Sequence, residues 1–249
     1  MLNNGRNSFL SNIPPVTKNL LIINLIIWLA MLIVPTKLGF DAIAYGGLHY
    51  FSAPDFNPVQ LLTYMFMHST DTFAHLFFNM FTLWMFGITL ERVLGSQRFL
   101  FFYITVGIGA GLFQELVWGL TWHGPFFDWV SSSTGYPVDA VKAAYSAGEL
   151  SQWQSFYLNH MVTIGASGAI YGILLAFGML FPNRPLFLMF IPVPIKAKYM
   201  VIGYGVIEIL LGVGGNDGIA HFAHLGGMIF GFIMIYYWKK KGIVHGDFF

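Results

Sequence analysis

A serine and a histidine in two distant segments have the side-chain types needed for acyl transfer. Ser167 lies in the run Gly165-Ala166-Ser167-Gly168, where small neighbours leave its hydroxyl uncrowded. The run opens a predicted helix, whose first turn offers free backbone N–H groups and a positive dipole end to an oxyanion. His224 is a candidate base, and a serine beside a base is the minimum for an activated nucleophile.

His75 and Asn79 form a second candidate pair. They are four residues apart, so they share one face of a helix and can act on a common point. Both side chains are free to bind a developing oxyanion. The plainer interpretation of this pair, and of His221 with His224, is hydrogen bonding between helices. The spacing alone leaves both interpretations open.

The composition indicates that these residues lie in a membrane. Of 249 residues, 56% are hydrophobic and 9% are charged, whereas about a quarter are charged in an average soluble domain. One soluble core cannot hide so much apolar surface from water, so we predict a polytopic membrane protein. The absence of cysteine excludes thiolate metal sites and cysteine nucleophiles. Twelve basic and eleven acidic residues almost cancel, so the chain lacks the excess positive charge that would attract nucleic acid.

The apolar runs predict an all-α bundle of six transmembrane helices. A bilayer crossing needs about 20 residues, and the runs that approach this length lie near 20–34, 73–90, 99–120, 165–181, 199–213 and 219–238. The apolar stretch 186–195 is expected to form an interfacial loop because its prolines disfavour a spanning helix. The chain then divides into a cytoplasmic segment 1–19, a membrane domain 20–238 and a cytoplasmic tail 239–249.

The positions of the basic residues predict how the protein is oriented in the membrane. An even number of spans places both termini on one side, where most cations gather: Arg6, Lys18, Arg92, Arg98, Arg184, Lys196, Lys198 and Lys239 to Lys241. This side is cytoplasmic by the positive-inside bias, which suits a bacterial inner membrane. The loops 35–72, 121–164 and 214–218 then face outward, and we expect 121–164 to be an exposed, mobile excursion.

Glycine spacing indicates which helices meet. Gly168 and Gly172 form one small-xxx-small step on the fourth predicted helix. Gly227 and Gly231 form another on the sixth. If the helices cross backbone to backbone at these steps, the serine and the histidine both lie one turn outward of the contact. A hydrogen bond between hydroxyl and imidazole is then geometrically reasonable. Two acids in the spans, Glu115 and Glu208, are expected to serve packing, paired with backbone or other polar groups.

Four segments together carry a family resemblance. They are His75-Leu76-Phe77-Phe78-Asn79 followed by Gly87, Glu91-Arg92-Val93-Leu94-Gly95-Ser96, Gly165-Ala166-Ser167-Gly168-Ala169-Ile170-Tyr171-Gly172, and Ala223-His224-Leu225-Gly226-Gly227 with Gly231. In type and order, over residues 60–238, they resemble the motifs of the rhomboid family of intramembrane serine proteases. The outer segment 121–164 is unusually long for that family, which leaves substrate entry open.

The resemblance implies a rhomboid-like six-helix bundle with a water-accessible cavity open to the outer face. It implies a serine endopeptidase that cleaves transmembrane or juxtamembrane segments of membrane proteins through a Ser-His dyad without a third acidic member. Ser167 would be the nucleophile and His224 the general base. His75, Asn79 and the backbone N–H of Ser167 would form the oxyanion hole, and Tyr171 would pack against the imidazole of His224. The implied partners are transmembrane protein substrates and the lipid bilayer, with no metal, organic cofactor or nucleic acid.

Three other functions remain open from the sequence. The first is a catalytically silent rhomboid-like protein that binds membrane clients, because a fold alone does not confer activity. The second is a zinc hydrolase built from His68, His75, His221 and His224, although the chain has no His-Glu-x-x-His motif. The third is a transporter, although inverted halves are not evident.

Overall fold

The protein is an all-α bundle, as predicted. The structure, a computed structural model, describes residues 12–39, 41–188, 191–214 and 220–244. A helix lies at each of the six predicted places: α1 (Pro15–Leu38), α4 (Phe73–Thr82) continued by η3 (Leu83–Gly87) and α5 (Ile88–Leu94), α6 (Ser96–Thr121), α10 (Ser167–Leu180), α11 (Ala197–Gly214) and α12 (His221–Lys240). Arg6, most of the predicted loop 214–218 and the outer parts of the two predicted terminal segments lie outside the described residues.

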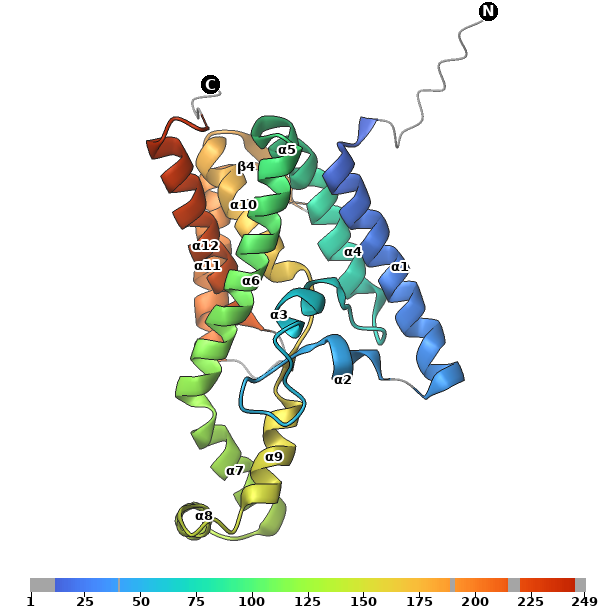
Figure 1. Cartoon of the computed structure of the whole chain (residues 1–249). Coiled ribbons are helices and arrows are strands. Elements are labelled where there is room, and N and C mark those ends of the chain that lie inside the picture. Colours follow the sequence, from blue (N-terminus) through green and yellow to red (C-terminus); the bar gives the residue numbers. More distant parts are fainter. Residues whose placement is uncertain (1–11, 40, 189–190, 215–219, 245–249) are drawn as a thin grey trace, which may run out of the picture.

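Among the described residues, four stretches are long and apolar enough to cross a membrane: Pro15–Val34, Phe73–Leu94, Ser96–Thr121 and Ala197–Gly214. Helix α10 is apolar but shorter, and α12, which bears two histidines near its start, is not among these four. The count of six spans therefore stays a prediction. Helix α1 begins and α12 ends at the same end of the bundle, beside α5 (Figure 1), the arrangement that an even number of crossings requires.

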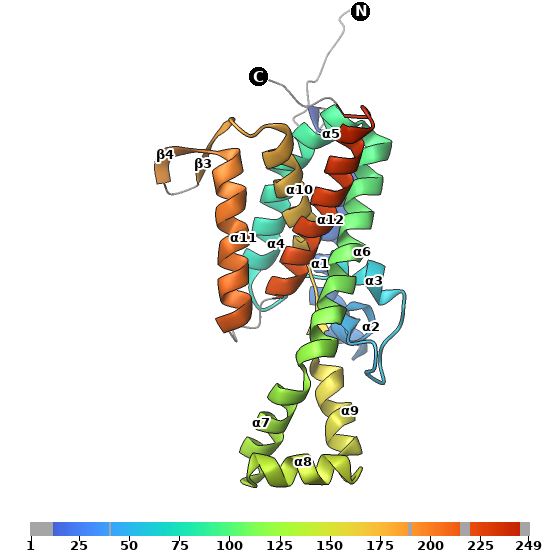
Figure 2. The same ribbon diagram turned by 90° about the vertical axis from the view of Figure 1, so that its left-hand side faces the viewer.

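Helix α10 is the central element of the bundle and lies among α4, α6, α11 and α12 (Figures 1 and 2). Ten of its 14 residues are buried, because the helix is apolar on every side. At 1.5 Å per residue, 14 residues extend only about 21 Å, less than the ~30 Å of hydrocarbon. The helix therefore spans only part of the bundle, and it begins inside the bundle, with Ser167 as its first residue (Figure 1).

The predicted glycine crossing of α10 and α12 is confirmed. A Cβ on Gly227 would collide with the carbonyl oxygen of Gly168, and one on Gly231 would lie 3.0 Å from the Cα of Gly172. Side chains are absent from both surfaces here, so the two backbones are in direct contact. This close approach sets the distance between the residues one turn further out on each helix.

The segment 121–164, expected as a loop, is mostly helical. It forms α7 (His123–Thr134), α8 (Val138–Ser146) and α9 (Ser151–His160), which project beyond the bundle (Figures 1 and 2). Phe126 and Val130 are four residues apart and are buried in a separate apolar cluster. Ser132 and Ser133 donate their hydroxyls to the carbonyls of Asp128 and Trp129, four residues earlier, so the helix itself satisfies them.

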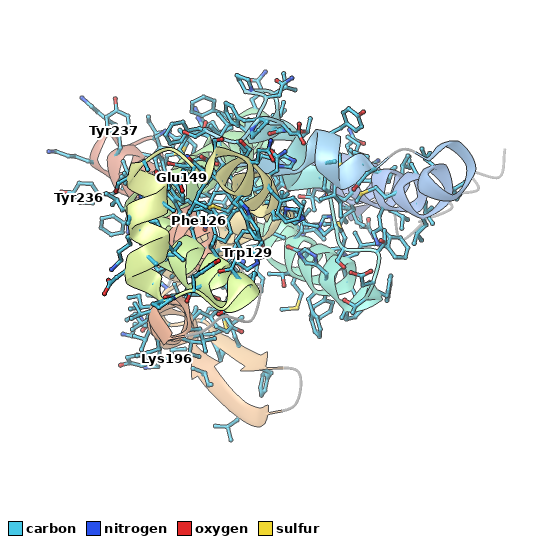
Figure 3. All side chains as sticks on the ribbon, turned by 90° about the horizontal axis from the view of Figure 1, so that it is seen from below. Phe126, Trp129, Glu149, Lys196, Tyr236 and Tyr237 are labelled. Atoms are coloured by element: carbon cyan, nitrogen blue, oxygen red, sulfur yellow. The ribbon has the colours of Figure 1, made fainter. Side chains whose placement is uncertain are left out.

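Figure 3 views the bundle from the end that carries α7, α8 and α9. Phe126 and Trp129 lie among α7, α8 and α9, whereas Tyr236 and Tyr237 point outward from α12. The predicted interfacial loop 186–195 falls largely within an antiparallel hairpin of β3 (Pro185–Leu188) and β4 (Ile191–Lys196). The remaining short elements belong to the first outer loop and its neighbour: α2 (Ala42–Gly46), β1 (Leu48–His49), α3 (Gln60–Thr63), η2 (Tyr64–Phe66) and β2 (Val162–Thr163).

A buried carboxylate joins three helices at the other end. Glu91 on α5 accepts hydrogen bonds from the backbone N–H groups of Val16 and Thr17, at 2.9 and 2.7 Å. It also accepts from the hydroxyls of Thr17 and Ser96, at 2.8 and 2.7 Å. The first-turn donors of α1 are thus capped from α5, and Ser96 ties in the start of α6. Gly95, with a φ of +79°, makes the turn between α5 and α6.

Glu91→Ala is expected to lower the free energy of unfolding by about 3 kcal/mol or more, because buried donors lose a charged acceptor. Unfolding in detergent micelles, followed by the helical circular dichroism signal, measures the loss. The matched control is Glu149→Ala, which removes an exposed acid and should change stability by less than about 0.5 kcal/mol. Equal effects of the two substitutions would contradict the capping role.

Candidate active site

The structure brings Ser167 and His224 into contact. Nε2 of His224 lies 2.8 Å from Oγ of Ser167, across the crossing of α10 and α12. Ser167 is half-buried, and His224 is 8% exposed. For the hydroxyl to donate to Nε2, the neutral imidazole must carry its proton on Nδ1. A serine in this arrangement can transfer its proton to the imidazole as it attacks a carbonyl.

Tyr171 holds the imidazole from one side. Its ring lies parallel to that of His224, with a centroid separation of 4.2 Å and an interplanar angle of 7°. Its hydroxyl donates to Oε1 of Glu208 on α11. Tyr171 is one turn after Ser167 on α10, so one helix supplies both the hydroxyl and the stacked ring.

Glu208 pairs with polar side chains, as expected, and these partners belong to the candidate site. Its Oε2 lies 2.6 Å from Nδ1 of His221 and 3.0 Å from Nδ1 of His224. The side chain is buried. The resemblance implied no third acidic group beside the serine and the histidine, yet a carboxylate lies next to the far nitrogen of His224. The sequence contained one indication of this contact: an acid within a spanning helix is costly and requires polar partners. This cost does not identify which residues the partners are.

Glu115, the second acid expected to serve packing, does pair with backbone. Its Oε2 accepts a hydrogen bond from the N–H of Phe51 at 2.8 Å. This contact ties the predicted loop 35–72 to α6.

Tyr64, which belongs to no motif recognised in the sequence, fixes the loop before Ser167. The N–H of Gly165 donates to the carbonyl of Tyr64 at 2.9 Å. The Tyr64 hydroxyl donates to the carbonyl of Gly107 on α6 at 2.6 Å. Just upstream, β2 pairs with β1 of the first outer loop. The serine is therefore positioned by α6 and by both outer segments, as well as by its own helix.

His75 presents one ring nitrogen to the serine loop. Its Nδ1 accepts a hydrogen bond from the N–H of Ser69 at 3.2 Å, so the proton of the neutral ring is on Nε2. The position that a Cβ of Gly165 would occupy is 2.8 Å from this Nε2 and 3.6 Å from Oγ of Ser167. Gly165 has a φ of +123°, and a side chain here would collide with the His75 ring, so the position requires glycine. The close approach places Nε2 of His75, an N–H donor, beside the loop that carries the Ser167 hydroxyl.

Asn79 lies one turn from His75 and is buried. Its Nδ2 donates to the His75 carbonyl at 2.7 Å, which leaves the second N–H of the amide available. Behind His75, the ring of His68 lies 5.1 Å away between centroids. His68 precedes α4, and burial, with a further contribution from His75, lowers its pKa to about 4. His68 is therefore neutral at physiological pH.

One group of side chains in the described part of the chain has the arrangement of a metal site. The ligand atoms of Glu208, His221 and His224 lie within 4.8 Å of one another. This set differs from the four histidines weighed from the sequence, since His68 and His75 do not belong to it. Two histidines and a carboxylate are a donor set that zinc accepts.

Comparison with known proteins identifies relatives of the chain. The family model described as the Rhomboid domain matches residues 56–241. The rhomboid protease AarA of Providencia stuartii is 29% identical over 175 residues, covering 67% of this chain and 51% of that protein. Rhomboid protein 1, mitochondrial, of Saccharomyces cerevisiae is 29% identical over 175 residues, covering 69% and 40%. RHOMBOID-like protein 4 of Arabidopsis thaliana is 26% identical over 161 residues, covering 65% and 29%. This chain spans about half the length of these relatives, or less.

Proposed function

Because this chain belongs to the rhomboid family, we propose that it is an intramembrane serine endopeptidase that cleaves transmembrane or juxtamembrane segments of membrane proteins. The observation that supports the proposal is the 2.8 Å contact between Ser167 Oγ and His224 Nε2. A family relative is named a rhomboid protease. The proposed enzyme uses no cofactor, since serine and histidine suffice for acyl transfer.

In the proposed mechanism, Oγ of Ser167 attacks the scissile carbonyl carbon while its proton passes to Nε2 of His224. The C=O electron pair moves onto oxygen, where the N–H groups of His75, Asn79 and the Ser167 backbone stabilise the charge. When the C–N bond breaks, Nε2 returns the proton to the leaving amine. Water then hydrolyses the acyl-enzyme with His224 as base.

The substrate must unwind before it reaches the serine. A peptide bond within a helix has its carbonyl hydrogen-bonded and covered by side chains, so cleavage requires a locally extended segment. Small or helix-breaking residues lower the cost of unwinding. Water must also reach Ser167, and we propose that it enters through a cavity open to the outer face.

We place the protein in the membrane with both termini cytoplasmic. Described cations such as Arg92, Arg184 and Lys239 belong to the side assigned to the cytoplasm, as the positive-inside bias requires. A membrane domain 20–238 would then be flanked by cytoplasmic segments 1–19 and 239–249. The charge pattern suits a bacterial inner membrane, although one relative is named mitochondrial.

A fluorophosphonate probe tests the proposed function. The detergent-solubilised protein should be labelled covalently at a single serine, and mass spectrometry should place the label on the peptide containing Ser167. Labelling should be unchanged by EDTA. A well-folded protein that is not labelled would favour the client-binding alternative, and labelling or hydrolysis lost in EDTA would favour a metal enzyme.

Removing an oxyanion donor should impair chemistry more than binding. We expect His75→Ala to lower kcat for a reporter transmembrane substrate by about 10²–10³-fold, with KM changed by less than about threefold. The control is Phe78→Ala on the same helix, since Phe78 is exposed and makes no described contact with the serine. A drop in kcat that is no larger for His75→Ala than for this control would exclude His75 from the oxyanion hole.

A further inference from the structure

We infer that Glu208 is a positioning residue for His224, so that the site works as a Ser167-His224-Glu208 triad rather than a dyad. The inference rests on the proposed function, because it concerns how that serine is activated. It draws on the contacts that converge on one carboxylate in the middle of α11.

The carboxylate of Glu208 is held on both oxygens. The Tyr171 hydroxyl donates to Oε1, and Nδ1 of His221 donates to Oε2 at 2.6 Å. These two contacts leave Oε2 at 3.0 Å from Nδ1 of His224. This approach is close but lacks the alignment of a hydrogen bond. The partners thus aim a buried negative charge at the nitrogen opposite the one that faces Ser167.

That placement favours two states the reaction needs. The carboxylate favours the tautomer with the proton on Nδ1, which leaves Nε2 free to accept the Ser167 proton. When Ser167 attacks, its proton moves to Nε2 and an imidazolium forms 3.0 Å from a carboxylate. The attraction between these charges is stronger in a buried site than in water. Glu208 takes no proton in this step, and the proton on Nε2 goes to the leaving amine.

Tyr171 links the two residues. The same side chain stacks on His224 and hydrogen-bonds Glu208, so the ring and the carboxylate keep a fixed relation. A role of Glu208 confined to joining α11 and α12 would need only the contact with His221. The second partner on α10 and the 3.0 Å approach to Nδ1 of His224 point to the imidazole as the group being positioned.

The first test compares Glu208→Gln with wild type in liposomes containing a reporter transmembrane substrate. Glutamine keeps the shape, but its N–H can donate to Nδ1 and force the proton onto Nε2. We expect kcat to fall by about 10²-fold or more, with KM within about threefold. The control is Glu115→Gln, the same change at a buried acid that pairs with the Phe51 backbone. Its kcat should stay within about threefold of wild type.

A second variant tests the same contact with a smaller change to the structure. Tyr171→Phe keeps the ring over His224 and removes the hydrogen bond to Glu208, so we expect a folded protein with a modestly lower unfolding temperature and a kcat lower by about threefold to tenfold. The rate of fluorophosphonate labelling should fall in parallel in both variants. Wild-type rates in Glu208→Gln and Tyr171→Phe would overturn the inference while leaving the protease intact. Failure to label the wild type at Ser167 would instead overturn the proposed function.

Removing and adding metal distinguishes the proposed triad from a zinc site. If Glu208, His221 and His224 formed a zinc site needed for activity, EDTA would abolish wild-type cleavage. Micromolar zinc would then restore it. The triad predicts activity that EDTA leaves unchanged, so activity lost in EDTA and regained with zinc would overturn it.

Discussion

Ser167→Ala is expected to reduce cleavage of a reconstituted transmembrane substrate by about 10⁴-fold or more, because the nucleophile is lost while the binding surfaces remain. The measurement is product formation by purified protein in liposomes, with substrate binding checked in parallel. Ser132→Ala, at an exposed serine on α7, is the control and should retain full activity. Cleavage by Ser167→Ala at a rate near that of the control would remove the serine from the mechanism.

The base should be as sensitive to substitution as the nucleophile. His224→Ala should lose activity to a similar extent, because a serine hydroxyl without a base is a weak nucleophile at neutral pH. The double variant Ser167→Ala/His224→Ala should be no worse than either single variant, since residues that act as a unit are strongly non-additive. Additive losses would show that the two side chains act separately, despite the 2.8 Å contact between them.

The glycine crossing should be as sensitive as the chemistry. Gly227→Ala is expected to lower the free energy of unfolding by about 3 kcal/mol and to abolish cleavage. The new methyl would overlap the carbonyl oxygen of Gly168, which is backbone and can move only if α10 and α12 separate. That separation would withdraw Ser167 from His224.

Gly203→Ala on α11 is the matched control, because nothing lies within 4 Å of the position its Cβ would take. Alanine also has the higher helix propensity, so this variant should be neutral or more stable by up to about 1 kcal/mol. Thermal unfolding in micelles and cleavage in liposomes measure both effects. Wild-type stability of Gly227→Ala would show that the backbones do not approach this closely.

The sequence by itself determined the membrane class, the places of the main helices and the meeting of α10 with α12. The composition alone indicates a membrane protein, because so much apolar surface must be covered by lipid rather than exposed to water. The crossing was also predictable, since Gly168, Gly172, Gly227 and Gly231 mark a face of each helix where backbones can touch. Once that face is known, the proximity of Ser167 and His224 follows from their position along each helix.

Only the tertiary structure decided which residues surround the imidazole and the serine loop. Helix α11 is apolar on all sides, so its sequence has no periodicity from which the rotation of Glu208 toward His221 and His224 could be read. The contacts of Glu91 with α1, and of Tyr64 with the serine loop, join segments that no short-range pattern connects. Sequence patterns report the faces and spacing within one element. The orientation of one element against another follows from the packing of the whole chain, which also folded 121–164 into helices.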